Sequence, residues 1–82
     1  MVMEDKIDYR IVELSQYPYD IEVEALVVTN GKLVKGQGIE VKKVYSFLNT
    51  EKVRGSSKAL VELAKDKDVK YIALCDVLTK KY

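Results

Sequence analysis

Apolar residues are most concentrated in residues 22–35, where two β-branched runs flank the dipeptide Asn30-Gly31. Asn-Gly favours positive φ at both central positions of a two-residue turn, so it predicts a hairpin between a strand over 21–29 and a strand that begins at Lys32. The tip of this hairpin would be apolar on both faces, and we expect a homodimer to cover the second face. The register pairs Val28 with Leu33 and Val27 with Val34.

Residues 7–14 precede this hairpin and show a period of two, with Ile7, Tyr9 and Ile11 on one face. The pattern predicts a first strand. Ser15 to Asp20 contains Pro18, which lacks a backbone donor, and predicts a turn.

Residues 58–67 carry apolar positions with helical spacing, and either Ser56 or Ser57 is suited to cap a helix there. Residues 69–74 are apolar on both faces and predict a final, central strand. The buried stripe of the predicted helix is Leu60, Leu63 and Ala64.

Residues 39–49 fit two structures. As a helix, the segment places Val41, Val44, Tyr45 and Leu48 on one stripe, with Phe47 off that stripe and exposed. As a strand, it has suitable β-branched and aromatic residues. We adopt the helix on periodicity and keep the strand as the alternative.

Together these segments predict an α+β fold, with a single-layer, mostly antiparallel sheet of about four strands packed on one or two helices. The element order is β-β-β-α-α-β, or β-β-β-β-α-β if residues 39–49 form a strand. The 82 residues form one domain, 1–82, and we expect residues 1–5 and 79–82 to be frayed.

The amino-acid composition limits which catalytic, metal-binding and membrane-spanning features the protein can have. The chain has no histidine and one cysteine, Cys75, so an intramolecular disulfide and a histidine-based triad are excluded. We expect no metal, no cofactor and a non-enzymatic protein. No apolar run reaches the roughly 20 residues of a membrane span, and we expect a cytoplasmic location without membrane contact. The abundance of Lys and Glu is thermophile-like.

The formal net charge of +1 conceals an acidic segment, residues 1–24, and a basic segment, residues 31–58. The basic segment contains two glycine loops that each precede a predicted helix, and helix N-termini attract phosphate. The sequence therefore predicts a binding surface for an anionic partner, and a nucleic acid is the partner it favours. The candidate residues are Lys35, Gly36, Gly38, Lys42, Lys43, Phe47, Arg54, Gly55, Ser56, Ser57 and Lys58.

Two other functions stay open. A protein-interaction or regulatory module would act through the apolar hairpin face or a strand edge. A cation-binding protein would use the carboxylates of Asp20, Glu22 and Glu24, of which the last two share a strand face. A solvated basic face without a ligand is the structural alternative to all three.

Overall fold

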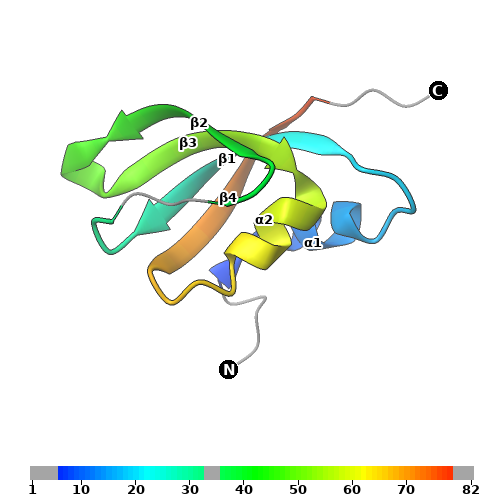
Figure 1. Ribbon diagram of the computed structural model, residues 1–82, viewed down its shortest axis with the longest axis horizontal. Helices are drawn as coiled ribbons and strands as arrows, with labels where there is room; N and C mark the ends of the chain where they lie inside the picture. The colour runs from blue at the N-terminus through cyan, green and yellow to red at the C-terminus, as the bar shows by residue number, and fades with distance from the viewer. Residues whose placement is uncertain (1–5, 33–35, 79–82) are drawn as a thin grey trace.

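The computed structural model describes residues 6–32 and 36–78 (Figure 1). The predicted fold class, an α+β domain with four antiparallel strands in one sheet and two helices, is confirmed for these residues, although the element order is α-β-β-β-α-β. The elements are α1 (Tyr9–Ser15), β1 (Glu22–Thr29), β2 (Ile39–Tyr45), the 3-10 turn η2 (Ser46–Leu48), β3 (Thr50–Ser56), α2 (Ser57–Leu63) and β4 (Val69–Val77).

The strand order in the sheet is β2-β3-β1-β4. Because β3 and β4 are both antiparallel to β1, they run parallel to each other with β1 between them, and α2 connects them in a split β-α-β unit. Helices α1 and α2 pack beside each other on one face of the sheet (Figure 1). The core between the layers includes Ile11, Leu60, Val27, Val53 and Ile72.

The two faces of the sheet differ in burial. Along β1, buried residues alternate with half-buried or exposed ones, so Val23, Ala25 and Val27 point toward the helices while Leu26 and Val28 point away. No helix of the described residues covers the side that Leu26 and Val28 share, and we call this side the open face. The predicted strand over 21–29 is confirmed in β1.

The strand predicted over residues 7–14 is wrong, because this segment forms α1. Asp8 caps the helix by accepting a hydrogen bond from the backbone N–H of Arg10 at 3.0 Å. Ile7 and Ile11 are buried at a spacing of four residues, and Tyr9, which the strand would have buried with them, is 62% exposed. The same isoleucines fit both periods, and the cap decides between them.

The predicted Asn30-Gly31 hairpin is also wrong. Both edges of β1 are occupied by other strands, since Val28 pairs with Thr50 of β3 and with Tyr71 of β4. Gly31 has the positive φ expected of it (106°). The Asn30 side chain contacts the turn before β4 instead, where its Nδ2 donates a hydrogen bond to Asp68 Oδ1 at 2.8 Å. The predicted partners Leu33 and Val34 lie outside the described residues.

Residues 39–45 form strand β2, so the adopted helix over 39–49 is wrong and the alternative is correct. A bulge between Val41 and Lys43 explains the helical pattern. It inserts Lys42 as an extra residue, and Val41 and Val44 then face Val53 and Glu51 of β3 on the same side of the sheet. Two apolar residues three positions apart therefore share a face of a strand.

The predictions of a helix over residues 58–67 and of a strand over residues 69–74 are confirmed in part. Leu60, Leu63 and Ala64 are buried as predicted, but α2 ends at Leu63 rather than near Lys67. Strand β4 is confirmed and continues to Val77, yet it lies at the edge of the described sheet rather than at its centre. Its outer edge receives Ile7 in an isolated bridge to Ile72, and both side chains are buried.

Strand β3 has no counterpart in the predicted elements. Its inward residues are Glu51, Val53 and Gly55, so only one of the three shows the apolar signal of a buried strand face. Neither helix within the described ranges is long and apolar enough to cross a membrane.

Candidate nucleic-acid interface

The two predicted glycine loops lie next to each other, and only the second leads into a helix. A Cβ atom on Gly55 would lie 2.7 Å from the carbonyl oxygen of Gly38, so glycine at position 55 is required for the close approach of the two backbones. Gly36 and Gly38 lead into strand β2 instead of a helix, and Lys35 lies outside the described residues. Gly55 therefore allows the close packing of β3 against the backbone that precedes β2.

Three groups of the second loop, one each from Ser56, Ser57 and Lys58, form hydrogen bonds within the fold. Ser56 accepts a hydrogen bond from the backbone N–H of Ala59 at 3.0 Å as the cap of α2. The backbone N–H of the fully buried Ser57 donates to the carbonyl oxygen of Ile21 at 2.8 Å. Lys58 donates from Nζ to the carbonyl oxygens of Tyr17 and Tyr19 at 2.6 and 3.2 Å, which ties the turn after α1 to α2.

Charged side chains of both signs lie beside the first glycine loop. Gly36 and Gln37 line an open pocket of about 650 Å³ that also contains Glu62, Lys65 and Asp66. Lys65 is already paired with Glu62, with an Nζ–Oε2 distance of 3.0 Å. Two carboxylates and one paired lysine do not favour a phosphate here.

The remaining candidates lie on the β2–β3 hairpin. Lys42 is the bulge residue and pairs with Glu40 at 3.4 Å. Lys43 is exposed, and its Nζ lies 5.3 Å from the ring centroid of Tyr45, which is a cation–π contact. Since residues two apart on a strand share a face, Lys43 and Tyr45 both lie on the open face.

Strand register assembles a row of four residues across the open face. Directly paired residues of an antiparallel sheet point to the same side, so the row runs through all four strands. Its two ends are aromatic, and Tyr71 is 39% exposed while Tyr45 is half-buried. The row consists of Tyr45, Thr50, Val28 and Tyr71.

The adjacent row is basic on one side and apolar on the other. Lys43 of β2 pairs with Lys52 of β3, and Leu26 and Ala73 continue the row on β1 and β4. Each lysine thus stands beside the aromatic row on the same face. The arrangement combines two tyrosine rings with two cations on a surface no described helix covers.

The opposite end of the open face is acidic. Arg54 lies between Glu24 of β1 and Glu40 of β2 in the register, and Asp76 follows next to Glu24. Arg54 thus has two carboxylates as register partners, whereas the register partners of Lys43 and Lys52 among the described residues include no acidic residue. The predicted acidic and basic segments meet in this row, and Lys43 and Lys52 lie toward the tyrosine end.

The turn of the β2–β3 hairpin presents two apolar side chains to solvent. Phe47 is fully exposed and Leu48 is 67% exposed. The exposure of Phe47 agrees with its expected place outside the core, although the segment is a turn and not a helix.

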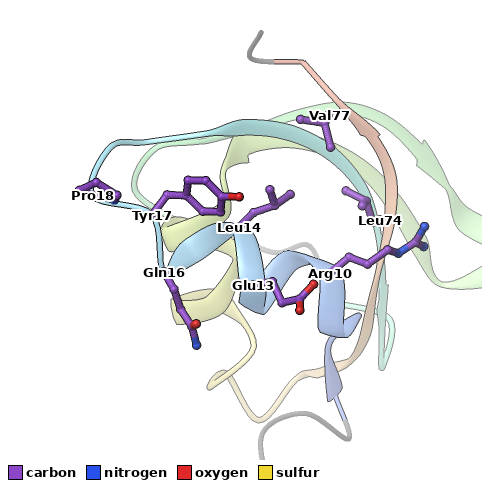
Figure 2. A pocket seen from close by; sticks show the side chains of 8 residues that line it. All are labelled: Arg10, Glu13, Leu14, Gln16, Tyr17, Pro18, Leu74 and Val77. Atoms are coloured by element: carbon purple, nitrogen blue, oxygen red, sulfur yellow. The ribbon is translucent and has the colours of Figure 1, made fainter. Parts of the chain in front are cut away.

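A separate pocket of about 810 Å³ lies between α1, the turn after it and β4 (Figure 2). Figure 2 shows Leu14, Leu74 and Val77 around this space, with the Arg10 side chain extending toward β4. Arg10 is held by Asp8, with an Nη2–Oδ2 distance of 2.7 Å, and this hydrogen bond lowers the pKa of Asp8 to about 2. The pocket is mainly apolar, and its one arginine is already bound to a carboxylate.

Carboxylates and the thiol do not assemble into a metal site in the described part of the chain, where no group of three or more His, Cys, Asp or Glu side chains is suitably placed. Glu22 and Glu24 lie on one face as expected, but Glu24 is in register with Arg54. Cys75 is exposed on β4.

Sequence reasoning selected Lys43 and Phe47 as candidates, assigned Tyr45 to a helical stripe, and did not select Lys52 or Tyr71. Lys52 and Arg54 alternate with Glu51 and Val53, and this period of two was the available signal for β3. The chain matches no family model, no curated protein and no solved structure in the comparisons.

Proposed function

We propose that this protein binds single-stranded nucleic acid on the open face of its sheet. One observation carries the proposal: Tyr45 and Tyr71 lie in one row across that face, and Lys43 and Lys52 lie in the row beside it. Aromatic side chains stack unpaired bases, and lysines beside them neutralise phosphates. As part of the same proposal the protein is cytoplasmic, where a lone thiol such as Cys75 stays reduced.

The spacing of the tyrosines favours a single strand over a duplex. Three interstrand steps separate Tyr45 from Tyr71, which corresponds to about 14 Å across the sheet. A single strand that crosses the sheet can place one base on each ring, because its bases are free to turn toward the protein. In a duplex the bases are paired and stacked, and a flat sheet face does not reach their rings.

Binding of labelled single-stranded DNA and RNA, measured by fluorescence anisotropy at several salt concentrations, tests the proposal. Two phosphate contacts, from Lys43 and Lys52, predict a slope of log affinity against log salt of about −1.4 for a single strand. A duplex of the same sequence is expected to bind more weakly. The absence of saturable, salt-sensitive binding at micromolar protein contradicts the proposal.

A matched pair of charge variants localises the site. Lys52→Gln is expected to make the salt slope shallower by about 0.7, because one phosphate contact is lost. Lys65→Gln removes the same charge from the helix side, where Lys65 is paired with Glu62, and is expected to leave the slope unchanged. Equal effects of the two variants would indicate attraction by net charge alone.

Self-association is a second candidate function, favoured by the half-buried Leu26, Val28 and Ala73 at the centre of the open face. A second copy packed there would form the homodimer expected from the sequence. Val28→Lys separates the two functions in sedimentation and binding experiments. A dimer face is expected to lose assembly, whereas a nucleic-acid face is expected to bind with a steeper salt dependence, because the added cation lies in the row between Tyr45 and Tyr71.

A further inference from the structure

The tip of the β2–β3 hairpin holds a large aromatic side chain entirely in solvent. Phe47 is the one phenylalanine of the chain, and it follows Tyr45 by two residues. Because Tyr45 and Phe47 are two positions apart in the chain, their Cα atoms lie within about 7 Å of each other. Phe47 therefore stands close to the aromatic row of the open face, in the turn that follows the pair of Tyr45 and Thr50.

Hydrogen bonds fix the turn that presents Phe47. Asn49 adopts the left-handed conformation with φ of 49°, and its carbonyl oxygen accepts the backbone N–H of Thr29 on β1 at 2.8 Å. Thr50 Oγ1 donates to the carbonyl oxygen of Leu48 at 2.8 Å. These contacts tie the turn to β1 and to the first residue of β3, so binding at Phe47 orders little backbone.

We infer that Phe47 is a third base-stacking residue, which lengthens the site beyond the sheet; this inference rests on the proposed function. The bound strand then crosses the open face from Tyr71 on β4 to Tyr45 on β2 and continues over the hairpin tip. The cation of Lys43 lies against Tyr45, at the point where the strand leaves the sheet. A ring at the tip serves every base, because each base has a π-face.

A third stacking position at Phe47 predicts that removing its ring weakens the binding of long oligonucleotides and not of short ones. Phe47→Leu keeps an apolar side chain at the tip but removes the ring. For oligonucleotides too short to reach beyond Tyr45, this variant is expected to bind as tightly as the wild type. For longer oligonucleotides it is expected to bind about tenfold more weakly, which is the size of one lost stacking contact.

Leu48→Ala is the matched control, since Leu48 is exposed in the same turn and carries no ring. It is expected to bind like the wild type at every length, and Phe47→Trp is expected to restore or exceed wild-type affinity. Because the Phe47 side chain is fully exposed, circular dichroism of all three variants is expected to match the wild type.

The outcomes separate this inference from the proposed function. Suppose that the wild-type protein binds, and that Phe47→Leu either matches it at all lengths, as Leu48→Ala is expected to do, or loses the same factor of affinity at all lengths. The third stacking position is then wrong, while the open-face site stands. If wild-type protein binds no oligonucleotide of any length, the proposed function fails and the inference fails with it.

Discussion

The two faces of the sheet are made by the same strands and carry opposite kinds of residues. On β4, Ile72 is completely buried against the helices, while its neighbour Tyr71 is 39% exposed on the open face. On β3, Val53 lies in the core and Lys52 lies outside it. Strand alternation thus lets one segment stabilise the fold with one set of side chains and offer a binding surface with the other. Substitutions at adjacent positions should therefore have different consequences.

The largest expected effect is loss of stability on the helix-covered face. Ile72→Ala leaves a cavity in the core and is expected to lower the free energy of unfolding by about 2–5 kcal/mol. Urea denaturation monitored by circular dichroism measures this change. A loss below about 1 kcal/mol would mean that β4 is not packed as described, and the comparison of the faces would lose its basis.

A smaller loss of stability is expected where β2 and β3 approach each other. Gly55→Ala places a Cβ atom 2.7 Å from the Gly38 carbonyl oxygen and should cost about 1–3 kcal/mol, because backbone must shift. Urea denaturation again provides the measurement. Gly36→Ala is the control, since its nearest contact is the side chain of Ile39, which can move; an equal loss in both variants would contradict a specific approach of the two backbones.

On the open face a substitution is expected to weaken binding and to leave stability nearly unchanged. Tyr71→Leu removes a ring and should weaken single-strand binding about tenfold, with the free energy of unfolding changed by no more than about 0.5 kcal/mol. Anisotropy titrations and urea denaturation of the same preparation measure the two quantities. Tyr9→Leu is the matched control on α1, where the tyrosine is also exposed. Equal binding losses in the two variants would remove the distinction between the faces.

The smallest effect concerns the edge where α1 meets β4. The hydrogen bond from Arg10 lowers the pKa of Asp8 from 3.8 to about 2, so the ionised carboxylate favours the folded state. This stabilisation is complete above the unfolded pKa and is lost as the pH falls from about 3.8 through 2. Arg10 is largely exposed, so solvent screening keeps this contribution small.

Asp8→Asn tests this linkage because asparagine keeps the helix cap and removes the charge. The free energy of unfolding of the variant is expected to fall below that of the wild type at neutral pH and to converge with it near pH 2. A difference that persists unchanged at low pH would mean that the carboxylate charge is not the cause.

Sequence reasoning succeeded where one signal dominated a segment. β1 and β4 are long apolar runs, and α2 has a serine cap followed by Leu60 and Leu63 at helical spacing. It failed where two signals competed. Ile7 and Ile11 fit both periods, and the bulge at Lys42 gave β2 a helical spacing of valines. The buried Glu51 and Gly55 removed the apolar pattern of β3.

The candidate site depends on strand order, and strand order is set by long-range packing. Lys43 and Phe47 were found because they are basic or aromatic within a basic segment. Lys52 and Tyr71 are 19 positions apart in the chain, and only the insertion of β1 between β3 and β4 brings them to one face. Composition and spacing carry no information about that insertion.

Nuclear magnetic resonance of isotope-labelled protein, titrated with an unlabelled single-stranded oligonucleotide, tests the central claim most directly. The account predicts saturable shifts of backbone and side-chain signals of Lys43, Tyr45, Lys52 and Tyr71, with little change along α1 and α2. Saturable shifts confined to the helix side, or none at all at concentrations well above micromolar, would contradict a binding site on the open face.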